Sequence, residues 1–299
     1  METTKSIWFN GKMIPWEEAN IHVLTHSLHY GGGVFEGLRV YKTDKGPAIF
    51  RLKEHTDRLF YSANVLQLEI PYSKEEINKA HINLVKDCEL QSGYIRPLVF
   101  SGYGKMGLNP KGAPIETMIA CWPWGAYLPE EGIDVKITDY IRIHPKSTVC
   151  DAKICGHYVN SILSVQQLEG THYREAMLLD YNGNIAEGPG ENFFMIKDGV
   201  IYTPKLGTIL KGITRATIFE ILEDLGYKLI EKDILPEEAF QCDEAFYVGS
   251  AAEVTGIKSI NDNKLGDGEV GPVTHKVKDY YMDIVHGRNE KYEKYLSYI

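Results

Sequence analysis

The sequence has no long apolar segment. Of its 299 residues 43% are hydrophobic, yet no run of about 18 apolar residues occurs, so a membrane-spanning helix is not expected. The first residues, METTKSIWFNGKMIPWEE, lack the basic and then apolar order of a secretory signal. We therefore expect a cytoplasmic protein whose apolar residues form a core.

Positive charge and paired cysteines are also scarce. Asp and Glu outnumber Lys and Arg by 41 to 32, and no basic stripe is visible, which argues against a nucleic acid or an anionic membrane as partner. The five cysteines contain no CxxC pair, and their number is odd. We expect reduced, partly buried thiols rather than a zinc or redox site. The cysteines are Cys88, Cys121, Cys150, Cys155 and Cys242.

Strand-like and helix-like segments alternate in two halves of the chain. Asn10-Gly11 predicts an early hairpin, and apolar spacing predicts helices over residues 52–67 and 75–90. Further helices are expected over 214–226 and 271–287, with strands over 93–104, 116–124, 173–180, 191–204 and 244–260. A Pro, Gly and acidic cluster separates the halves. We predict an α+β protein with domains at 1–125 and 134–299 and a linker at 126–133.

Two patterns that often bind nucleotides or metals are incomplete. The glycine-rich stretch YGGGVFEG, residues 30–37, fits neither the dinucleotide fingerprint nor the P-loop. His22, His26 and His29 have ligand-like spacing, but no carboxylate or cysteine set completes a site. We therefore expect neither a nucleotide site of these kinds nor a metal.

Lys153 lies in DAKICGHYVNS, a short polar stretch ahead of an expected helix, with Tyr158 close behind it. A lysine captures carbonyl groups when burial or neighbouring cations disfavour its charge, whereas most lysines are simply solvated. The best-known carbonyl partner is pyridoxal phosphate. That cofactor also needs a phosphate site, a carboxylate for its pyridine nitrogen and a phenol near its ring hydroxyl.

Candidates for these groups are present elsewhere in the chain. Residues 212–214 begin an amphipathic helix, where backbone N–H groups favour an anion, although Thr214 alone could serve only as a helix cap. Residues 250–252 form a turn of small residues after an expected strand, suited to phosphate or a substrate carboxylate. Glu187 precedes a Gly-Pro-Gly turn that could aim its carboxylate inward, and a solvated turn glutamate is the alternative.

Together these segments resemble the branched-chain amino acid aminotransferases, class IV pyridoxal-phosphate enzymes with the fold of D-amino acid aminotransferase (fold type IV). The resemblance runs nearly end to end, through HSLHYGGGVFEGLRVY, EHTDRL, GYIRPLVFSGYGKMGLNP, WGAYL, AKICGHYVNS, AEGPGENFF, GITRATIF and VGSAAEVTGI. It implies a smaller N-terminal and a larger C-terminal domain with the cofactor between them. It also implies at least a homodimer whose partner helps to line the substrate pocket.

The resemblance further implies individual roles. Lys153 matches the Schiff-base lysine that moves the proton between the substrate Cα and the cofactor C4′. The other cofactor ligands would be Tyr158 at the ring O3′, Glu187 at the pyridine nitrogen, and Arg58, Ile213, Thr214 and Ser250 at the phosphate. The substrate would meet aromatic walls from Tyr30, Phe35 and Tyr127, the carboxylate-end groups Tyr94 and Arg96, and the backbone amides of Ala251 and Ala252.

The implied activity is amino transfer from L-leucine, L-isoleucine or L-valine to 2-oxoglutarate, with Arg96 receiving the distal carboxylate. Two alternatives share the fold, a D-amino acid aminotransferase and an aminodeoxychorismate lyase, and the chirality of the accepted substrate would discriminate them. An alternative of another class is a non-catalytic binding relative. Such a protein would never take up pyridoxal phosphate.

Overall fold

The computed structural model describes residues 2–299, which fall into two compact units. The first unit holds the described residues up to Gly125 together with Ala152–Gly156 and Ile284–Ile299, and the second holds Ala126–Asp151 and His157–Asp283. The predicted assignment of everything after residue 133 to one C-terminal domain is therefore corrected in two places. The segment that carries Lys153 and the C-terminal tail both belong to the first unit.

Backbone pairing explains both corrections. The last strand, β17 (Leu296–Tyr298), pairs antiparallel with β5 (Gly46–Phe50) and so forms an edge of the first sheet. Ile154 forms an isolated bridge with Val34, which fastens the lysine segment to the same unit. Neither pairing leaves a local signal, because each joins residues that are far apart in the sequence.

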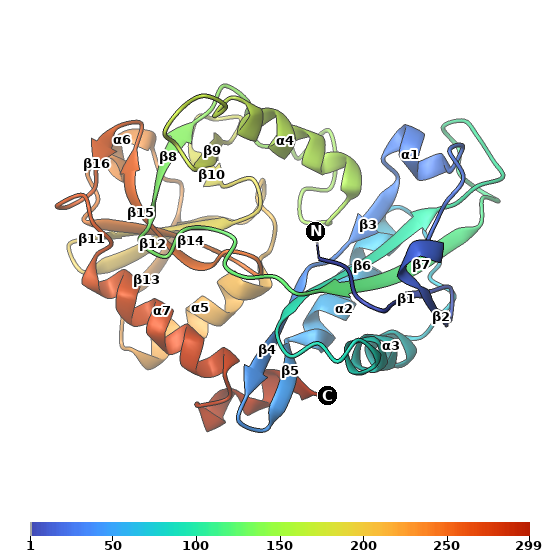
Figure 1. Ribbon diagram of the computed structural model, residues 1–299. Helices are drawn as coiled ribbons and strands as arrows, with labels where there is room; N and C mark the ends of the chain where they lie inside the picture. Colours follow the sequence, from blue (N-terminus) through green and yellow to red (C-terminus); the bar gives the residue numbers. More distant parts are fainter. Residues whose placement is uncertain (1) are drawn as a thin grey trace. The chain divides into compact units, whose positions relative to one another are not determined.

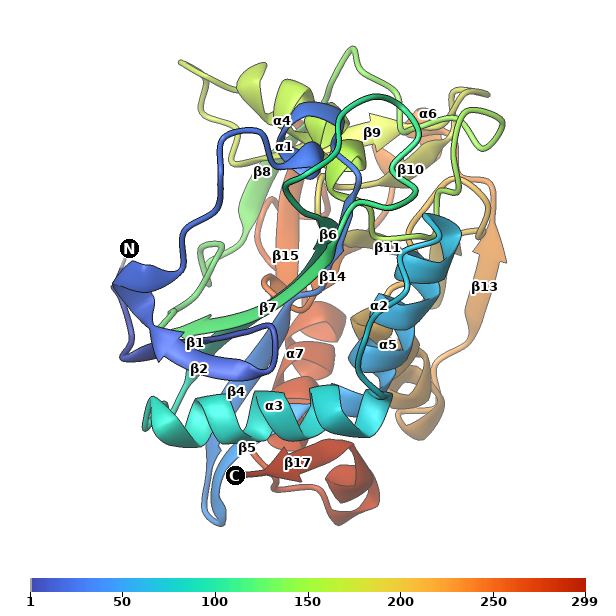
Figure 2. The same ribbon diagram turned by 90° about the vertical axis from the view of Figure 1, so that its right-hand side faces the viewer.

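The first unit contains an eight-stranded sheet in the order β17-β5-β4-β6-β7-β1-β2, with β3 also paired to β6 (Figures 1 and 2). Its strands are β1 (Ser6–Phe9), β2 (Lys12–Pro15), β3 (Gly33–Phe35), β4 (Leu38–Thr43), β5, β6 (Gly93–Ser101), β7 (Ile115–Trp122) and β17. Its helices are α1 (His26–Tyr30), α2 (Leu52–Val65) and α3 (Lys74–Asp87), with short 3-10 turns at Trp16–Glu18 and Glu290–Tyr295. The core between α3 and the sheet includes Leu38, Ile77, Leu84, Ile95 and Ile119.

A proline in the middle of this sheet lies opposite a break between two neighbouring strands. Pro97 lies in β6 between the residues that pair with β4 and those that pair with β3. Its carbonyl accepts from the Glu36 N–H at 3.0 Å, so its own side of the strand faces the break between β3 and β4. A proline is tolerated there because the ladder is already interrupted. Glu36 and Gly37 occupy that break.

The second unit contains a nine-stranded sheet in the order β10-β9-β8-β15-β14-β11-β12-β13, with β16 paired to β15. A further pairing between β10 and β11 closes the first six of these strands into a ring. The strands are β8 (Ile133–Ile137), β9 (Glu175–Leu179), β10 (Ile185–Glu187), β11 (Asn192–Lys197), β12 (Val200–Pro204), β13 (Leu229–Lys232), β14 (Glu244–Gly249), β15 (Glu253–Ile260) and β16 (Asn263–Lys264). Apolar side chains including Val135, Met177, Phe193, Tyr247 and Ile257 form its core.

Four helices belong to this part of the chain. They are α4 (Tyr158–Gln166), α5 (Ile213–Asp224), α6 (Pro236–Ala239) and α7 (Pro272–Val285), whose last two residues belong to the first unit. A 3-10 turn at Cys155–His157 spans the boundary between the two units before α4. In Figure 1, α5 and α7 lie side by side, and the Tyr280 hydroxyl of α7 donates to Asp224 of α5 at 2.8 Å. The predicted helices over 75–90, 214–226 and 271–287 match α3, α5 and α7 within a few residues. The predicted α+β class is confirmed.

No helix within residues 2–299 is long and apolar enough to cross a membrane. Across the same residues, no cluster of three or more His, Cys, Asp or Glu side chains is arranged to hold a metal ion.

Candidate active site

Lys153 is held in place from both of its neighbouring elements. Its backbone N–H donates to the Ser62 hydroxyl of α2 at 2.9 Å, and its carbonyl accepts from the Phe35 N–H of β3 at 3.2 Å. Ala152 and Ile154, on either side of it, are buried in an apolar cluster with Val34 and Leu59. The half-buried side chain places its Nζ 5.0 Å from the centre of the Phe35 ring. A simply solvated surface lysine would not be anchored in this way.

Two of the three successive glycines, Gly31 and Gly33, make room for this segment. A Cβ on Gly31 would lie 3.0 Å from the Gly156 Cα, and a Cβ on Gly33 would lie 3.2 Å from the Cys155 Sγ. Gly31 also has a φ of +66°, which L side chains rarely adopt, and its carbonyl accepts from the Gly156 N–H at 3.1 Å. The glycine stretch that fits no nucleotide motif therefore lets the lysine segment pack closely.

Arg58 is bound by a carboxylate that the sequence did not single out. Its Nε and Nη2 donate to the two oxygens of Glu36 at 2.6 and 2.8 Å, and the His55 Nδ1 donates to Glu36 at 2.7 Å. Burial alone raises the pKa of Glu36, but the charge and hydrogen bonds of Arg58 and the His55 contact hold it well below its ordinary value. Burial lowers the pKa of His55, so this ring is neutral near pH 7. The group is thus one ion pair oriented by a neutral imidazole.

Phe35 connects the lysine to Arg96. The Arg96 guanidinium carbon lies 4.7 Å from the centre of the Phe35 ring and 5.4 Å from that of Tyr94. Within the described residues the Arg96 Nε is buried without a hydrogen-bond partner. The break after β3 brings Tyr94 close, since a Cβ on Gly37 would lie only 1.8 Å from the Tyr94 hydroxyl oxygen. The first unit thus gathers an amine, an apolar ring and a guanidinium.

Tyr30 is placed differently from these residues. It lies on α1 with an exposed side chain, its ring is 4.6 Å from that of His26, and its hydroxyl accepts from the Gly107 N–H at 3.3 Å. Its predicted place in the substrate wall stays a prediction.

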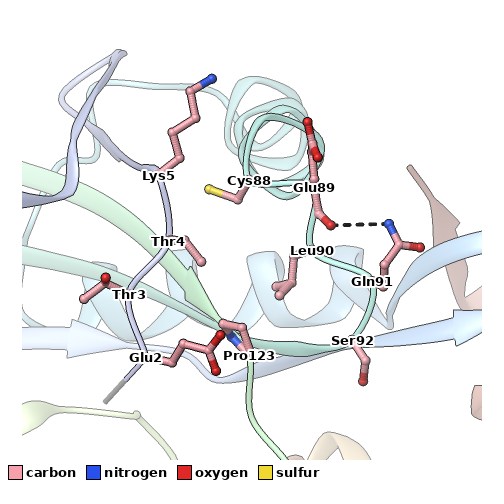
Figure 3. A pocket seen from close by; sticks show the side chains of 10 residues that line it. All are labelled: Glu2, Thr3, Thr4, Lys5, Cys88, Glu89, Leu90, Gln91, Ser92 and Pro123. Carbon is pink, nitrogen blue, oxygen red and sulfur yellow. Dashed lines mark hydrogen bonds between the residues drawn. The ribbon is translucent and has the colours of Figure 1, made fainter.

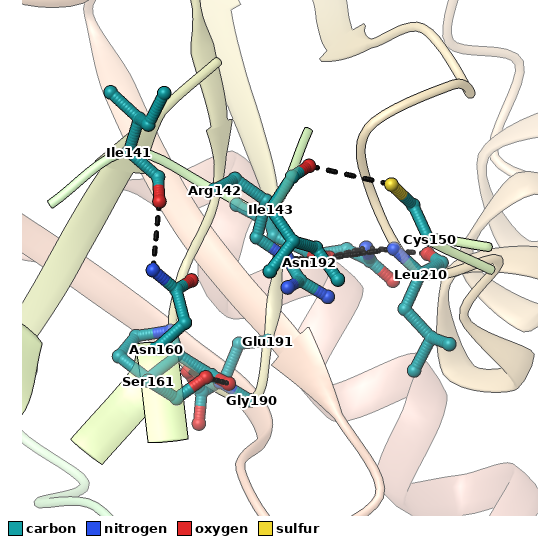
Figure 4. Close-up of polar contacts among 12 residues, drawn as sticks. Ile141, Arg142, Ile143, Cys150, Asn160, Ser161, Gly190, Glu191, Asn192 and Leu210 are labelled. Carbon is teal, nitrogen blue, oxygen red and sulfur yellow. Dashed lines mark hydrogen bonds and ion pairs between the residues drawn. The ribbon is translucent and has the colours of Figure 1, made fainter. Parts of the chain in front are cut away.

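In the second unit, Glu187 lies where β10 and β11 close the ring of strands. It pairs in register with Asn192, and its side chain is buried. Its carboxylate accepts from the Arg142 Nε at 2.5 Å, from the Asn192 Nδ2 at 2.9 Å and from the Leu210 N–H at 3.1 and 3.2 Å. Figure 4 shows the neighbouring contacts of Asn192, Leu210 and the segment around Arg142. The alternative of a solvated turn glutamate is excluded.

The first turn of α5 lies beside this carboxylate. Gly212 is the N-cap residue, and a Cβ there would lie 1.9 Å from the Asn192 Oδ1. Because Gly212 is the N-cap and Thr214 is the second residue of the helix, Thr214 is not the cap residue. Thr214 is buried one residue after Ile213, which begins the helix, where the N-terminal turn favours an anion.

Residues 250–252 form the turn between β14 and β15, as predicted. The two strands pair up to Gly249 and Glu253, and the Ala252 carbonyl accepts from the Thr255 hydroxyl at 2.8 Å. Tyr127 is partly exposed and hydrogen-bonds to Glu175, a buried carboxyl whose pKa burial raises to about 7.

Each unit, taken by itself, contains residues that suit groups of pyridoxal phosphate. The anchored Lys153 amine can bind an aldehyde, and the Glu187 carboxylate accepts several hydrogen bonds, one of them from a cation, so it is ionised as a protonated pyridine nitrogen requires. Tyr158 begins α4, and its phenol is among the groups that act electrostatically on Arg142, the same arginine that binds Glu187. The Tyr158 phenol and the Glu187 carboxylate therefore both interact with Arg142.

Several polar residues of these networks were not predicted as site residues, among them Glu36, Arg142 and Asn192. Glu36 is contained in the glycine-rich stretch, and Asn192 follows the Gly-Pro-Gly turn within AEGPGENFF. Arg142 stands between Ile141 and Ile143, and a charge inside an apolar stretch is the signal that would have found it.

A separate pocket lies in the first unit, away from these networks. It has a volume of about 620 Å³ and is lined by the start of the chain, by Pro123 and by the turn after α3 (Figure 3). Its wall includes Cys88, and it contains none of the predicted site residues.

Comparison with known proteins identifies the family. Residues 33–260 match the model of amino-transferase class IV. A branched-chain-amino-acid aminotransferase of Pseudomonas aeruginosa is 47% identical over 297 residues, which cover 98% of this chain and 97% of that protein. The corresponding Escherichia coli K12 enzyme is 40% identical over 298 residues, covering 97% of this chain and 96% of its own.

Solved structures agree with this match. The branched-chain amino acid aminotransferase from T.th., complexed with N-(5'-phosphopyridoxyl)-L-glutamate, is similar with a TM-score of 0.97 and 42% identity, covering 100% of this chain and 99% of that one. An enzyme from Thermoproteus uzoniensis, solved with norvaline, has a TM-score of 0.95 and 39% identity over 98% and 99% of the two chains. The resemblance seen in the sequence motifs is confirmed, and the chain belongs to the amino-transferase class IV family.

Proposed function

We propose that this protein transfers the amino group between L-leucine, L-isoleucine or L-valine and 2-oxoglutarate, using pyridoxal phosphate. The observation that carries the proposal is the grouping around Phe35. The Lys153 amine and the Arg96 guanidinium lie 5.0 and 4.7 Å from the same apolar ring. A reactive amine, an apolar wall and a cation for a distal carboxylate are the three features that this pair of substrates requires.

Each cofactor group has a proposed partner. Pyridoxal phosphate supplies an aldehyde that joins nitrogen and a protonated ring that accepts the electrons left on Cα. When the cofactor is bound, Lys153 would hold the aldehyde and move the Cα proton, and Glu187 would keep the pyridine nitrogen protonated. Tyr158 would donate to the ring hydroxyl oxygen. The Arg58 guanidinium, the Ile213 and Thr214 amides at the start of α5, and Ser250 would hold the phosphate.

Two kinds of substrate side chain must enter one pocket. Aliphatic groups pack against the aromatic residues Tyr30, Phe35 and Tyr127, while Tyr94 lies with Arg96 at the carboxylate end. The distal carboxylate of 2-oxoglutarate or glutamate pairs with Arg96, because an unpaired carboxylate among aromatic rings would be costly. The Ala251 and Ala252 amides bind the α-carboxylate that both substrates share. Arg96→Gln is expected to weaken glutamate turnover far more than leucine turnover.

Replacement of the lysine tests the proposal most simply. Lys153→Ala removes the amine and should lower turnover of L-leucine by at least about three orders of magnitude, with an unchanged circular dichroism spectrum. Lys146→Ala, at an exposed lysine seven positions earlier, is the matched control and should keep full activity. A Lys153→Ala enzyme with most of its activity would contradict the assignment.

We also propose that the protein is a cytoplasmic homo-oligomer, at least a dimer. Large apolar side chains are exposed on α1 and on the loop after β6, including Leu28 at 62% and Leu108 at 89%. A second copy is the partner that would cover them. The five free thiols suit a reducing compartment. Sedimentation at micromolar concentration should give a dimer or a larger species, and a persistent monomer would contradict the assignment.

A further inference from the structure

Arg142 is a buried cation that has no role in the proposed contacts with cofactor or substrate. Only 8% of the residue is exposed, and its backbone N–H is fixed by the Leu179 carbonyl at 2.7 Å. Its Nη1 is buried without a hydrogen-bond partner among residues 2–299. A buried charged donor left unpaired lowers stability, so packing alone does not account for an arginine at this position.

The geometry joins this arginine to one carboxylate oxygen. Its Nε donates to the Glu187 Oε1 at 2.5 Å, a charge-assisted contact between two buried groups. The Asn192 amide donates to the other oxygen at 2.9 Å. Since these two donors approach opposite oxygens, they fix the plane of the carboxylate as well as its position.

Arg142 stays protonated and positively charged. Burial lowers the pKa of this guanidinium, but the Glu187 charge and hydrogen bond outweigh that effect and keep its pKa above the ordinary value. The Tyr158 phenol and the Cys150 thiol are the other titratable groups that act on it. The Cys150 thiol points to the Ile143 carbonyl at 3.3 Å, and burial raises the pKa of Cys150, so it stays neutral (Figure 4).

A proton shared between Glu187 and a pyridine nitrogen can rest on either partner. A cation beside the carboxylate stabilises its anionic form and so leaves the proton on the nitrogen. Without that cation, the neutral acid and the neutral ring become the favoured pair in a buried site. The protonated ring is the form that accepts electrons from Cα.

We propose that Arg142 is a positioning residue that keeps Glu187 anionic and thereby holds the proton on the pyridine nitrogen of the bound cofactor. This inference rests on the proposed function, because it assumes that Glu187 faces that nitrogen. Arg142 acts through Glu187 and does not touch the substrate. Its loss should therefore lower kcat by about tenfold or more and change KM by no more than about twofold.

The position of the proton can be read directly in the holoenzyme. The ¹⁵N chemical shift of pyridine-labelled pyridoxal phosphate separates a protonated from an unprotonated ring nitrogen. The wild-type protein should give the protonated shift and Glu187→Gln the unprotonated one, with Arg142→Gln moved clearly toward the unprotonated value. Arg142→Lys, which keeps the charge, should stay near the wild type. Asn192→Ala, which removes a neutral donor from the same carboxylate, should shift less than Arg142→Gln.

The outcomes separate this inference from the proposed function. A protonated wild type with an unchanged shift in Arg142→Gln would overturn the role of Arg142 and leave the function intact. An unprotonated wild type, or a wild-type shift in Glu187→Gln, would overturn the assignment of Glu187 and this inference with it. If Arg142→Gln does not fold, Arg142→Met fills the same space with an apolar chain and must give the same displaced shift.

Discussion

Glu36 is completely buried, with 0% of its surface exposed, and its charge is matched by Arg58. The carboxylate connects the break after β3 to α2 and orients a guanidinium that we assign to the phosphate. Removing one partner of a buried ion pair leaves the other charge uncompensated. The position is therefore one where a small chemical change has a large effect.

Glu36→Gln is expected to lower the free energy of unfolding by about 3–5 kcal/mol, because it removes the charged partner from the buried Glu36–Arg58 ion pair. Urea unfolding measures the difference. Asp57→Asn is the matched control, since Asp57 lies next to Arg58 on α2 and pairs with Lys74 at the exposed surface. It should change the free energy of unfolding by less than about 1 kcal/mol. Equal losses of unfolding free energy in the two variants would contradict the prediction that the buried Glu36–Arg58 pair matters more than the surface pair.

Glu175 makes stability depend on pH. Burial raises its pKa from an ordinary 4.5 to about 7, so the folded protein binds this proton more tightly than the unfolded chain does. The stabilisation that the protonated Glu175 carboxyl contributes is fully present below about pH 4.5. It is lost as the pH rises through about 7. The loss amounts to about 3 kcal/mol, at 1.36 kcal/mol for each pKa unit.

Glu175→Gln removes this titration while keeping the shape of the side chain. The free energy of unfolding of the variant should therefore rise relative to that of the wild type, by up to about 3 kcal/mol, as the pH is raised across the same interval. Urea unfolding at several pH values gives both curves. Two parallel curves would mean that Glu175 does not titrate in this range.

At the scale of the element, the start of α5 depends on a residue without a side chain. A Cβ at Gly212 would lie 1.9 Å from the Asn192 Oδ1, so Gly212→Ala must displace the amide that donates to Glu187. We expect a loss of about 1–3 kcal/mol and weaker binding of pyridoxal phosphate. Gly125→Ala, where the added methyl meets nothing within 4 Å, is the control and should stay within about 0.5 kcal/mol.

Periodicity predicted the long elements well because their apolar faces repeat locally. The helix α3 is an example, with Ile77, Leu84 and Val85 buried at helical spacing behind a Ser73–Glu76 capping box. The short strand β10 was missed, since three residues carry no period and its pairing with β11 is a property of the closed ring. Strand β17 was missed for the same reason.

The site shows a similar division between local and distant information. Lys153, Tyr158 and Glu187 lie in short motifs that are visible in the sequence. Arg142 contacts Glu187 across 45 positions, and Glu36 contacts Arg58 across 22, so neither pairing is written in a contiguous segment. The partners that set the charge and orientation of the site residues are therefore brought together only by the tertiary fold.

At the scale of the whole molecule, the chain returns to its first unit twice. Ile284–Ile299 supplies β17 to the sheet that the N-terminal half begins, and Ala152–Gly156 is attached to β3 by an isolated bridge. The lysine segment is thus fastened by β3 and α2, while Glu187 and Tyr158 belong to the other unit. The proposed chemistry requires contributions from both units, and a single spectrum of the whole protein reports whether they act together.

That spectrum is the visible absorption of the purified protein with pyridoxal phosphate, recorded before and after L-leucine, L-glutamate or D-alanine is added. We predict a visible band that both L-amino acids bleach and D-alanine leaves unchanged. Bleaching by D-alanine alone would assign the protein to a D-specific activity of the same fold. The absence of any band after incubation with the cofactor would contradict the role of Lys153 and the proposed function altogether.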